Sequence, residues 1–143
     1  MKLAAIALAS TLGGCSMFMH SIEKPQATVK NVSIGSASWT GIRGQLDLDV
    51  MNPNNFGVPL SGIDWTMSIN GSRAITGHVE LSQTIPARGT APVSTTLTID
   101  ARDAMVVAQT LAAGGREYRI DAQLHFSSGF GNVDVAIAQS GTL

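Results

Sequence analysis

The chain has 143 residues, of which 44% are hydrophobic and 13% are charged, and its formal net charge is −1. This length fits a single domain with an ordinary hydrophobic core. The composition excludes a disordered chain, which combines low hydrophobicity with high net charge, and it lacks the basic surface that a nucleic-acid partner requires. The chain has one cysteine, so no intrachain disulfide can form and packing alone must stabilise the fold.

The first fourteen residues are typical of a bacterial signal peptide. Lys2 provides a positive start, and a largely apolar run over residues 3–12 follows. A run of about ten residues is too short to cross a hydrocarbon core of ~30 Å as a helix. Leu12-Gly13-Gly14-Cys15 then resembles a bacterial lipobox, which is cleaved before the cysteine and lipidated on its thiol. We therefore expect a signal peptide over residues 1–14 and a lipidated tether over residues 15–28.

The resemblance to a lipobox also implies a location. Bacterial lipoproteins carry two or three acyl chains, and two or more chains hold a protein stably on a membrane. Ser16 follows the cysteine, where an Asp favours retention in the inner membrane of Gram-negative cells. We therefore expect attachment to the outer membrane, with the domain facing the periplasm. The alternative is a chance cysteine after an ordinary signal peptide or in a buried N-terminal helix.

Beyond the tether, alternating apolar and polar residues predict β-strands. The segment 63–70 alternates strictly, and Asn70-Gly71 after it is a strong hairpin signal because both residues tolerate positive φ. The strand before it ends in the turn cluster Asn52-Pro53-Asn54-Asn55. The expected strands, in chain order, are residues 27–34, 43–51, 63–70, 73–82, 92–99, 117–126 and 132–138.

One segment departs from this alternation and predicts a helix. Asp100 can cap a helix that runs from Ala101 to about Ala113 and that Gly114-Gly115 ends. Seven short strands separated by turn signals, with a single helix between two of them, are typical of an all-β sandwich.

The segment Asn52-Pro53-Asn54-Asn55-Phe56-Gly57-Val58-Pro59-Leu60 carries the most specific information in the mature chain. It follows an alternating strand and precedes the Asn70-Gly71 hairpin and the stretch at 85–89. This order resembles the WHy (water stress and hypersensitive response) domain of the type 2 late-embryogenesis-abundant (LEA type 2) family, over roughly residues 29–137. The resemblance makes Asn52, Pro53, Asn54 and Phe56 a family-signature turn with a structural role.

The resemblance implies a fold and a function. It implies an all-β, antiparallel sandwich of the immunoglobulin or fibronectin type III kind with one helix, over residues 29–143. The family is linked to desiccation and other stresses, and no enzyme activity is attached to its fold. We therefore expect a membrane-anchored, non-enzymatic protein that protects the envelope, through a weakly apolar patch that shields partly unfolded proteins or the membrane. The alternative is a periplasm-facing adaptor or chaperone module that pairs an edge strand with an envelope protein.

The polar residues predict no catalytic centre. His20, His78 and His125 are dispersed and lack the spacing of a metal site, and His125 falls on the polar face of its strand, where we expect it to be exposed. The sequence contains no P-loop, nucleophile elbow or dinucleotide fingerprint. We expect no catalytic residue, no metal and no cofactor.

Two aspartates and two tryptophans have alternative interpretations. Asp47 and Asp49 lie on one strand face, but calcium takes six to eight oxygens, so we expect a solvated face. An enzyme would need distant residues, such as Asp47 with His78 and Arg116, to converge. Trp65 is expected in the core. Trp39 lies in an expected loop, where we favour a plug over one end of the sandwich against an exposed contact residue.

Overall fold

The structure is a computed structural model that describes residues 22–36, 38–72 and 74–143. Seven strands and one helix make up this part of the chain, which confirms the predicted fold class. In chain order they are β1 (Gln26–Ile34), β2 (Gly41–Met51), β3 (Val58–Ile69), β4 (Ile75–Ile85), β5 (Thr90–Asp100), α2 (Ala101–Ala112), β6 (Glu117–Ser128) and β7 (Gly131–Thr142).

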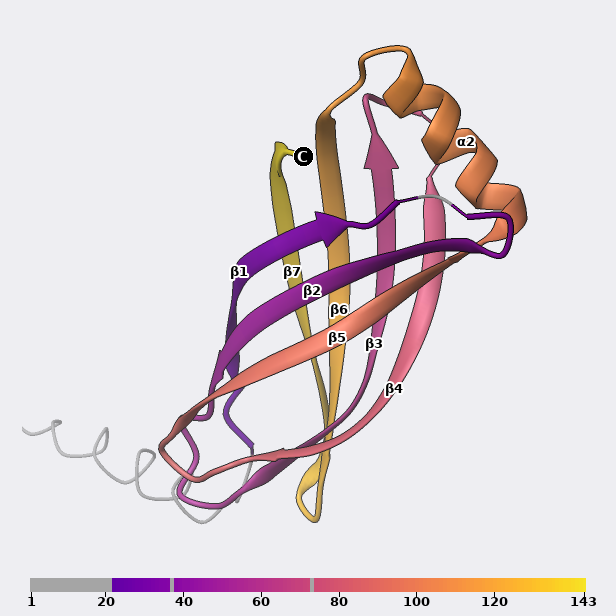
Figure 1. Ribbon diagram of the computed structural model, residues 1–143. Helices are drawn as coiled ribbons and strands as arrows, with labels where there is room; N and C mark the ends of the chain where they lie inside the picture. Colours follow the sequence, from indigo (N-terminus) through magenta and orange to yellow (C-terminus); the bar gives the residue numbers. More distant parts are fainter. Residues whose placement is uncertain (1–21, 37, 73) are drawn as a thin grey trace, which may run out of the picture.

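The strands form two antiparallel sheets that pack face to face (Figure 1). One sheet has the order β1-β2-β5 and the other has the order β4-β3-β6-β7. The chain therefore crosses between the sheets after β2 and returns after β4, and α2 carries it across again after β5. The four strands at the sheet edges are β1, β5, β4 and β7.

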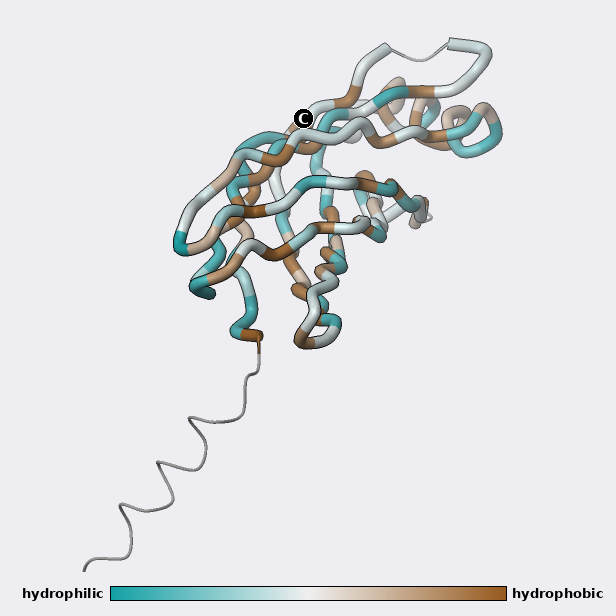
Figure 2. The backbone as a smooth tube through the Cα atoms, turned by 90° about the horizontal axis from the view of Figure 1, so that it is seen from below, coloured by the Kyte–Doolittle hydropathy of each residue, from teal (hydrophilic) through white to brown (hydrophobic). Residues whose placement is uncertain are grey.

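The core lies between the two sheets, where inward-facing residues alternate with solvent-facing ones. Figure 2 shows this alternation as successive brown and teal segments along the backbone. Trp65 on β3 is 2% exposed, as expected of a core residue. Its indole occupies the space above Gly77 on β4, where an added Cβ would lie 2.3 Å from Trp65 Cζ2. A residue without a side chain at position 77 is therefore what lets the largest core side chain lie flat against the sheet.

The β3–β4 hairpin has the turn that Asn70-Gly71 predicts. Asn70 has φ 52° and Gly71 has φ 70°, and the Ser72 amide donates to the Ile69 carbonyl at 2.9 Å. Positive φ at both central residues is the geometry that matches the right-handed twist of paired strands. The hairpin expected at this point is confirmed.

Helix α2 is also confirmed at nearly the expected bounds. The Asp100 carboxylate accepts from the Asp103 amide at 3.0 Å and so caps the helix. Ala104 and Val107 are buried against the end of the β1-β2-β5 sheet. Gly114, with φ 95°, follows the helix and lets the chain turn into β6.

The strands are longer than the sequence pattern predicts, most of all β3 and β7. β3 begins at Val58 rather than at residue 63, β4 continues to Ile85, and β7 continues to Thr142. The sequence pattern does not predict the first part of β3, because Pro59 and Gly62 interrupt the alternation that is typical of a strand. The register of β3 also shifts between Leu60 and Gly62 on both sides, which breaks the period of two.

The chain joins the sandwich earlier than the expected tether allows. β1 begins at Gln26, inside the segment 15–28, and the Glu23 amide already donates to the Asn54 side chain at 2.8 Å. The expected lipidation at Cys15 and the cleavage motif Leu12, Gly13 and Gly14 lie outside the described residues. None of the helices in the described part of the chain is long and apolar enough to span a membrane.

Candidate functional site

The turn after β2 is held by the buried side chain of Asn52. Its Nδ2 donates to the carbonyls of Phe56 at 2.8 Å, Ile85 at 3.0 Å and Pro86 at 3.2 Å. Its backbone amide donates to the Gly89 carbonyl at 2.9 Å. Phe56 lies where the chain crosses from one sheet to the other, and residues 85–89 lie where it crosses back. A single amide group therefore ties both crossings together.

Asn54 extends this network to the N-terminal segment. Its side chain donates to the Asn52 Oδ1 at 2.9 Å and to the Glu23 carbonyl at 2.9 Å, and it accepts from the Glu23 amide at 2.8 Å. Pro53 separates the two asparagines and ends strand pairing. Phe56 packs on Phe130 of the β6–β7 turn, with ring centroids 4.8 Å apart. The residues of the signature turn therefore organise one end of the sandwich and leave no polar group free for chemistry.

A second polar cluster lies on the outer face of the four-stranded sheet and consists of Asp64, His78, His125 and Asp134. His125 Nε2 lies 2.6 Å from Asp64 Oδ2, and His125 Nδ1 lies 2.7 Å from Asp134 Oδ1. The other oxygen of Asp64 contacts His78 Nδ1. Four side chains from β3, β4, β6 and β7 thus form one continuous chain of hydrogen bonds across the whole sheet.

The hydrogen bonds of this histidine–aspartate chain favour the charged forms of His125 and Asp64. Hydrogen bonds to Asp134 and then to Asp64 raise the pKa of His125 above its ordinary value of 6.5. Hydrogen bonds from His125 and His78 lower the pKa of Asp64 below its ordinary value of 3.8. Both nitrogens of His125 face carboxylates, so the protonated ring satisfies both partners and has no lone pair for a metal ion.

Sequence reasoning missed this cluster, although part of its signal was present. His125 was expected to be exposed, but its side chain is 29% exposed and both of its nitrogens have partners. Asp64 pairs with His78 in the β3–β4 hairpin and His125 pairs with Asp134 in the β6–β7 hairpin, so each local pair follows from hairpin register. The link between the two pairs depends on the contact of β3 with β6, which no local pattern reveals.

The residues that an enzyme would need do not converge. Asp47 lies on β2, in the other sheet from His78 on β4, and Arg116 follows α2 and donates to the Leu111 carbonyl at 3.2 Å. Asp47 accepts from Gln45 at 3.0 Å, and Asp49 pairs with Lys30 at 3.1 Å, so the two aspartates lie on a solvated face as expected. The part of the chain that the structure describes has no group of three or more His, Cys, Asp or Glu residues that could hold a metal ion.

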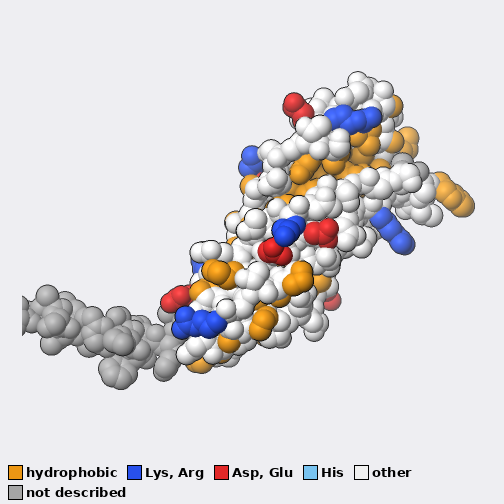
Figure 3. All heavy atoms as spheres, turned by 60° about the vertical axis from the view of Figure 1, so that its left-hand side comes forward, with side chains coloured by type: hydrophobic (Ala, Val, Ile, Leu, Met, Phe, Trp, Pro, Cys, Tyr) orange, Lys and Arg blue, Asp and Glu red, His pale blue; other side chains and the backbone are white. Residues whose placement is uncertain are grey.

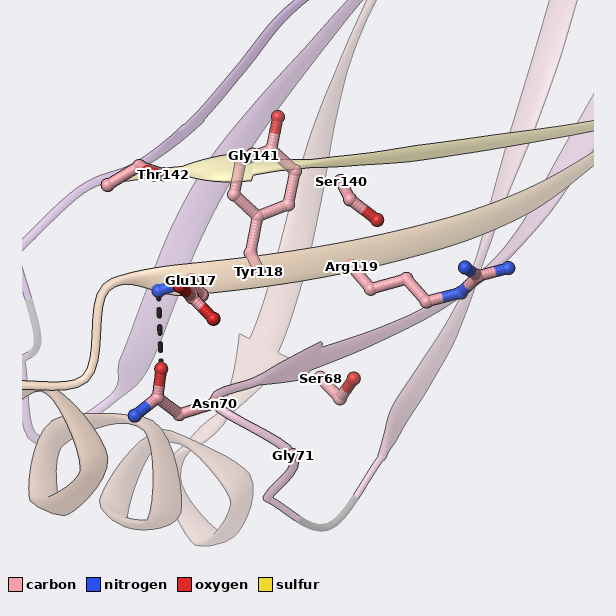
Figure 4. Close-up of a pocket in the computed structure, with 9 residues that line it drawn as sticks. All are labelled: Ser68, Asn70, Gly71, Glu117, Tyr118, Arg119, Ser140, Gly141 and Thr142. Carbon is pink, nitrogen blue, oxygen red and sulfur yellow. Dashed lines mark hydrogen bonds between the residues drawn. The ribbon is translucent and has the colours of Figure 1, made fainter.

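A shallow, open hollow of about 640 Å³ lies at the α2 end of β3, β6 and β7 (Figure 4). Tyr118 points across it towards Gly141, and Glu117 lies beside Asn70, which accepts from the Glu117 amide at 3.4 Å. Arg119 extends away along β6, where Asp121 binds its guanidinium with two contacts of 3.0 Å.

An apolar surface lies at the same end, between the β1–β2 loop and α2. Trp39 is 93% exposed and Met105 is 63% exposed. Together with Ser38, Ala101, Ala104 and Ala108 they line a hollow of about 340 Å³. The prediction that Trp39 plugs the end of the sandwich is wrong, because its side chain is almost fully exposed and α2 covers that end with Ala104 and Val107. We refer to Trp39, Met105 and the alanines between them as the apolar tip.

Replacing Asn52 by alanine should destabilise the fold strongly. The change leaves the buried carbonyl of Ile85 and the partly buried carbonyl of Phe56 without this donor, at about 1–3 kcal/mol for a buried unsatisfied group. Chemical unfolding followed by circular dichroism gives the free energy of unfolding. Asn55, which is exposed in the same turn, provides the matched control, and Asn55→Ala should have little effect. Equal losses in the two variants would contradict the role assigned to the Asn52 amide.

The free energy of unfolding should depend on pH through His125. Because its pKa is raised by folding, its contribution is present below about pH 6.5 and is lost as pH rises through the folded pKa. Asp64 acts in the opposite sense, and its contribution is lost as pH falls through its lowered pKa. Urea unfolding between about pH 6 and 9 should show a decline that His125→Gln removes and that Asp134→Asn reduces. A decline of the same size in His125→Gln would show that other groups cause it.

Comparisons with known proteins agree with this fold. The sequence profile of the family described as "Late embryogenesis abundant protein" (LEA_2) matches residues 47–141. No curated protein sequence matches the chain. Among the solved structures that are similar in fold, three have 16–17% sequence identity to this chain.

One of these structures is a protein from Archaeoglobus fulgidus, with TM-score 0.59, covering 86% of this chain and 96% of that one. The second, from Arabidopsis thaliana, has TM-score 0.67 and covers 88% and 85% of the two chains. The third is described as a late embryogenesis abundant (LEA) protein and has TM-score 0.65, with coverage of 95% and 79%. The family profile spans most of the chain, from the middle of β2 to the end of β7, and so the chain belongs to the late embryogenesis abundant (LEA_2) family.

Proposed function

We propose that this protein is a lipoprotein, anchored through a lipid on Cys15 after removal of residues 1–14, that protects the cell envelope during drying or osmotic stress without catalysing a reaction. Membership of the LEA_2 family supports a role in stress. The lipobox-like Leu12-Gly13-Gly14-Cys15 supports the anchor, and Ser16 supports the outer membrane, with the domain facing the periplasm.

The apolar tip is the observation that carries the protective role. The chain enters the sandwich beside Asn54, at one end of β2, whereas the tip lies beyond the other end of that strand (Figure 1). A domain anchored through residues before Ile22 would therefore present Trp39 and Met105 away from its point of attachment. Large exposed apolar side chains next to a concave, alanine-lined surface are suited to contact apolar segments of partly unfolded proteins.

Lipid attachment is tested by the variant Cys15→Ser in a bacterium that carries the lipoprotein pathway. We expect the wild-type chain to partition into the detergent phase of a phase-separating detergent, and its mass to show loss of fourteen residues and gain of a diacylglycerol. Cys15→Ser should remain uncleaved and carry no lipid. Ser16→Ala retains the cysteine and serves as the control. A wild-type chain that carries no lipid would overturn the anchor.

The protective role is tested by drying a labile enzyme together with this protein. Wild-type protein should give higher recovery of enzyme activity than equal masses of serum albumin. The double variant Trp39→Ser/Met105→Ser should fall to the albumin level, because it removes the exposed apolar contacts of the tip. Met51→Ser is the matched control, since Met51 is 37% exposed but lies at the opposite end of the molecule.

The two tryptophans provide an independent readout of the same contact. Trp39 is fully accessible to an aqueous quencher of fluorescence, whereas Trp65 is buried. Binding of a partly unfolded protein at the tip should shield Trp39 and leave Trp65 unchanged. Recovery no better than albumin, with no shielding of Trp39, would reject direct protection and favour the adaptor alternative.

A further inference from the structure

The four edge strands of the sandwich differ in how they are protected against pairing with another chain. Exposed edges can recruit further strands, and proteins block them with bulges, prolines and lysines. β1 has a bulge at Lys30, where its register with β2 shifts. β4 has a bulge between Glu80 and Gln83, and β5 carries Pro92. Three of the four edge strands therefore have a bulge or a proline that would interrupt continuous hydrogen bonding with an added strand.

β7 has no bulge, no proline and no lysine. Its register with β6 runs without a shift from Gly131 to Thr142, over 12 residues. It contains no proline and no basic residue, and its one charged side chain, Asp134, is already bound to His125. The exposed residues Ala136 and Ala138 on its outer face are small.

The inward-facing side of β7 is also incompletely covered. Val133, Val135 and Ile137 point towards the core, yet each is only half-buried, whereas the corresponding residues on the inner strand β3 are buried. Figure 3, which brings the β1 and β7 side forward, shows apolar side chains at the surface on this side of the molecule. A strand added next to β7 would cover these side chains if its own inward residues were apolar.

We propose that β7 is a self-association edge and that its partner is the β7 strand of a second copy, paired antiparallel about a two-fold axis. The charge of Asp134 favours this antiparallel arrangement over a parallel one. In a parallel, in-register pair the two Asp134 side chains would lie next to each other, and like charges in adjacent strands are destabilising. With the two-fold axis at Ala136, Asp134 instead faces Ala138 of the second copy. The inward residue Val135 then faces Ile137 of that copy, so the apolar face continues through eight strands.

For a protein anchored as proposed above, this pairing has a geometric consequence. The β6–β7 turn lies at the end where the chain enters the sandwich, because Phe130 packs on Phe56 there. Antiparallel pairing of β7 places these ends of the two copies at opposite ends of the dimer. Two copies held on one membrane would therefore lie with their strands along its surface rather than upright.

The test compares two double variants of the full chain in mild detergent by sedimentation velocity. Ala136→Glu/Ala138→Glu places three carboxylates in a row on the edge, so every symmetric register centred between 136 and 138 opposes like charges. Thr96→Glu/Thr98→Glu adds the same charge to the β5 edge, which Pro92 already interrupts, and is the matched control. We expect wild-type and control proteins to form dimers of twice the chain mass, and the β7 variant to dissociate about tenfold more readily.

Hydrogen exchange keeps the proposal testable if the β7 variant fails to fold. Amides of residues 131–142 in the wild-type chain should exchange more slowly as protein concentration rises, while those of β1 should not change. A wild-type chain that is monomeric at high concentration overturns the proposal. So does a dimer that both variants leave intact, or one whose β7 amides exchange at a rate independent of concentration.

Discussion

The arrangement of the two sheets depends on one buried amide. The chain crosses between the sheets after β2 and again after β4, and both crossings carry backbone carbonyls that would be buried without partners. Asn52 satisfies carbonyls on both crossings, and Asn54 links the pair to the N-terminal segment through Glu23. Buried polar groups that are fully paired define one packing, and partly paired ones destabilise it. The fold therefore has a buried hydrogen-bond network at one end of an otherwise apolar core.

The hydrogen bonds of Asn52 and Asn54 make the two ends of the domain different. The end with Asn52 and Asn54 also receives the N-terminal segment and holds the Phe56–Phe130 pair. The other end has α2, capped by Asp100, and the exposed side chains of Trp39 and Met105. Since β2 runs from one end to the other, the apolar tip lies at the opposite end of the sandwich from the entry of the N-terminal segment. In the anchored protein that we propose, the apolar tip would therefore lie at a distance from the tether.

On the outer face of the four-stranded sheet, side-chain hydrogen bonds connect the strands. Asp64, His78, His125 and Asp134 link all four strands through charge-assisted hydrogen bonds. Such bonds are stronger than neutral ones, and they reach the edge strand β7, which pairs with β6 alone among the described strands. The cluster therefore helps to hold β7 in register, and its strength depends on the protonation of His125.

Much of the fold follows from local sequence patterns. Alternation over residues 63–70 determined β3 and its buried Trp65, positive-φ residues at 70 and 71 determined the hairpin, and Asp100 determined the start of α2. These features depend on neighbours within a few residues, where periodicity and turn chemistry act directly. The first part of β3 was missed, because Pro59 and Gly62 break the period of two while strand pairing on both sides still holds the backbone extended.

The tertiary structure alone decided which distant residues meet. It joined Asp64 to His125 across 61 residues, it brought the carbonyls of Ile85 and Pro86 to the Asn52 amide, and it left Trp39 exposed beside Met105. Local patterns show which way a side chain faces relative to its own strand. They do not show which strand becomes its neighbour, because strand order is set by the packing of the two sheets as a whole.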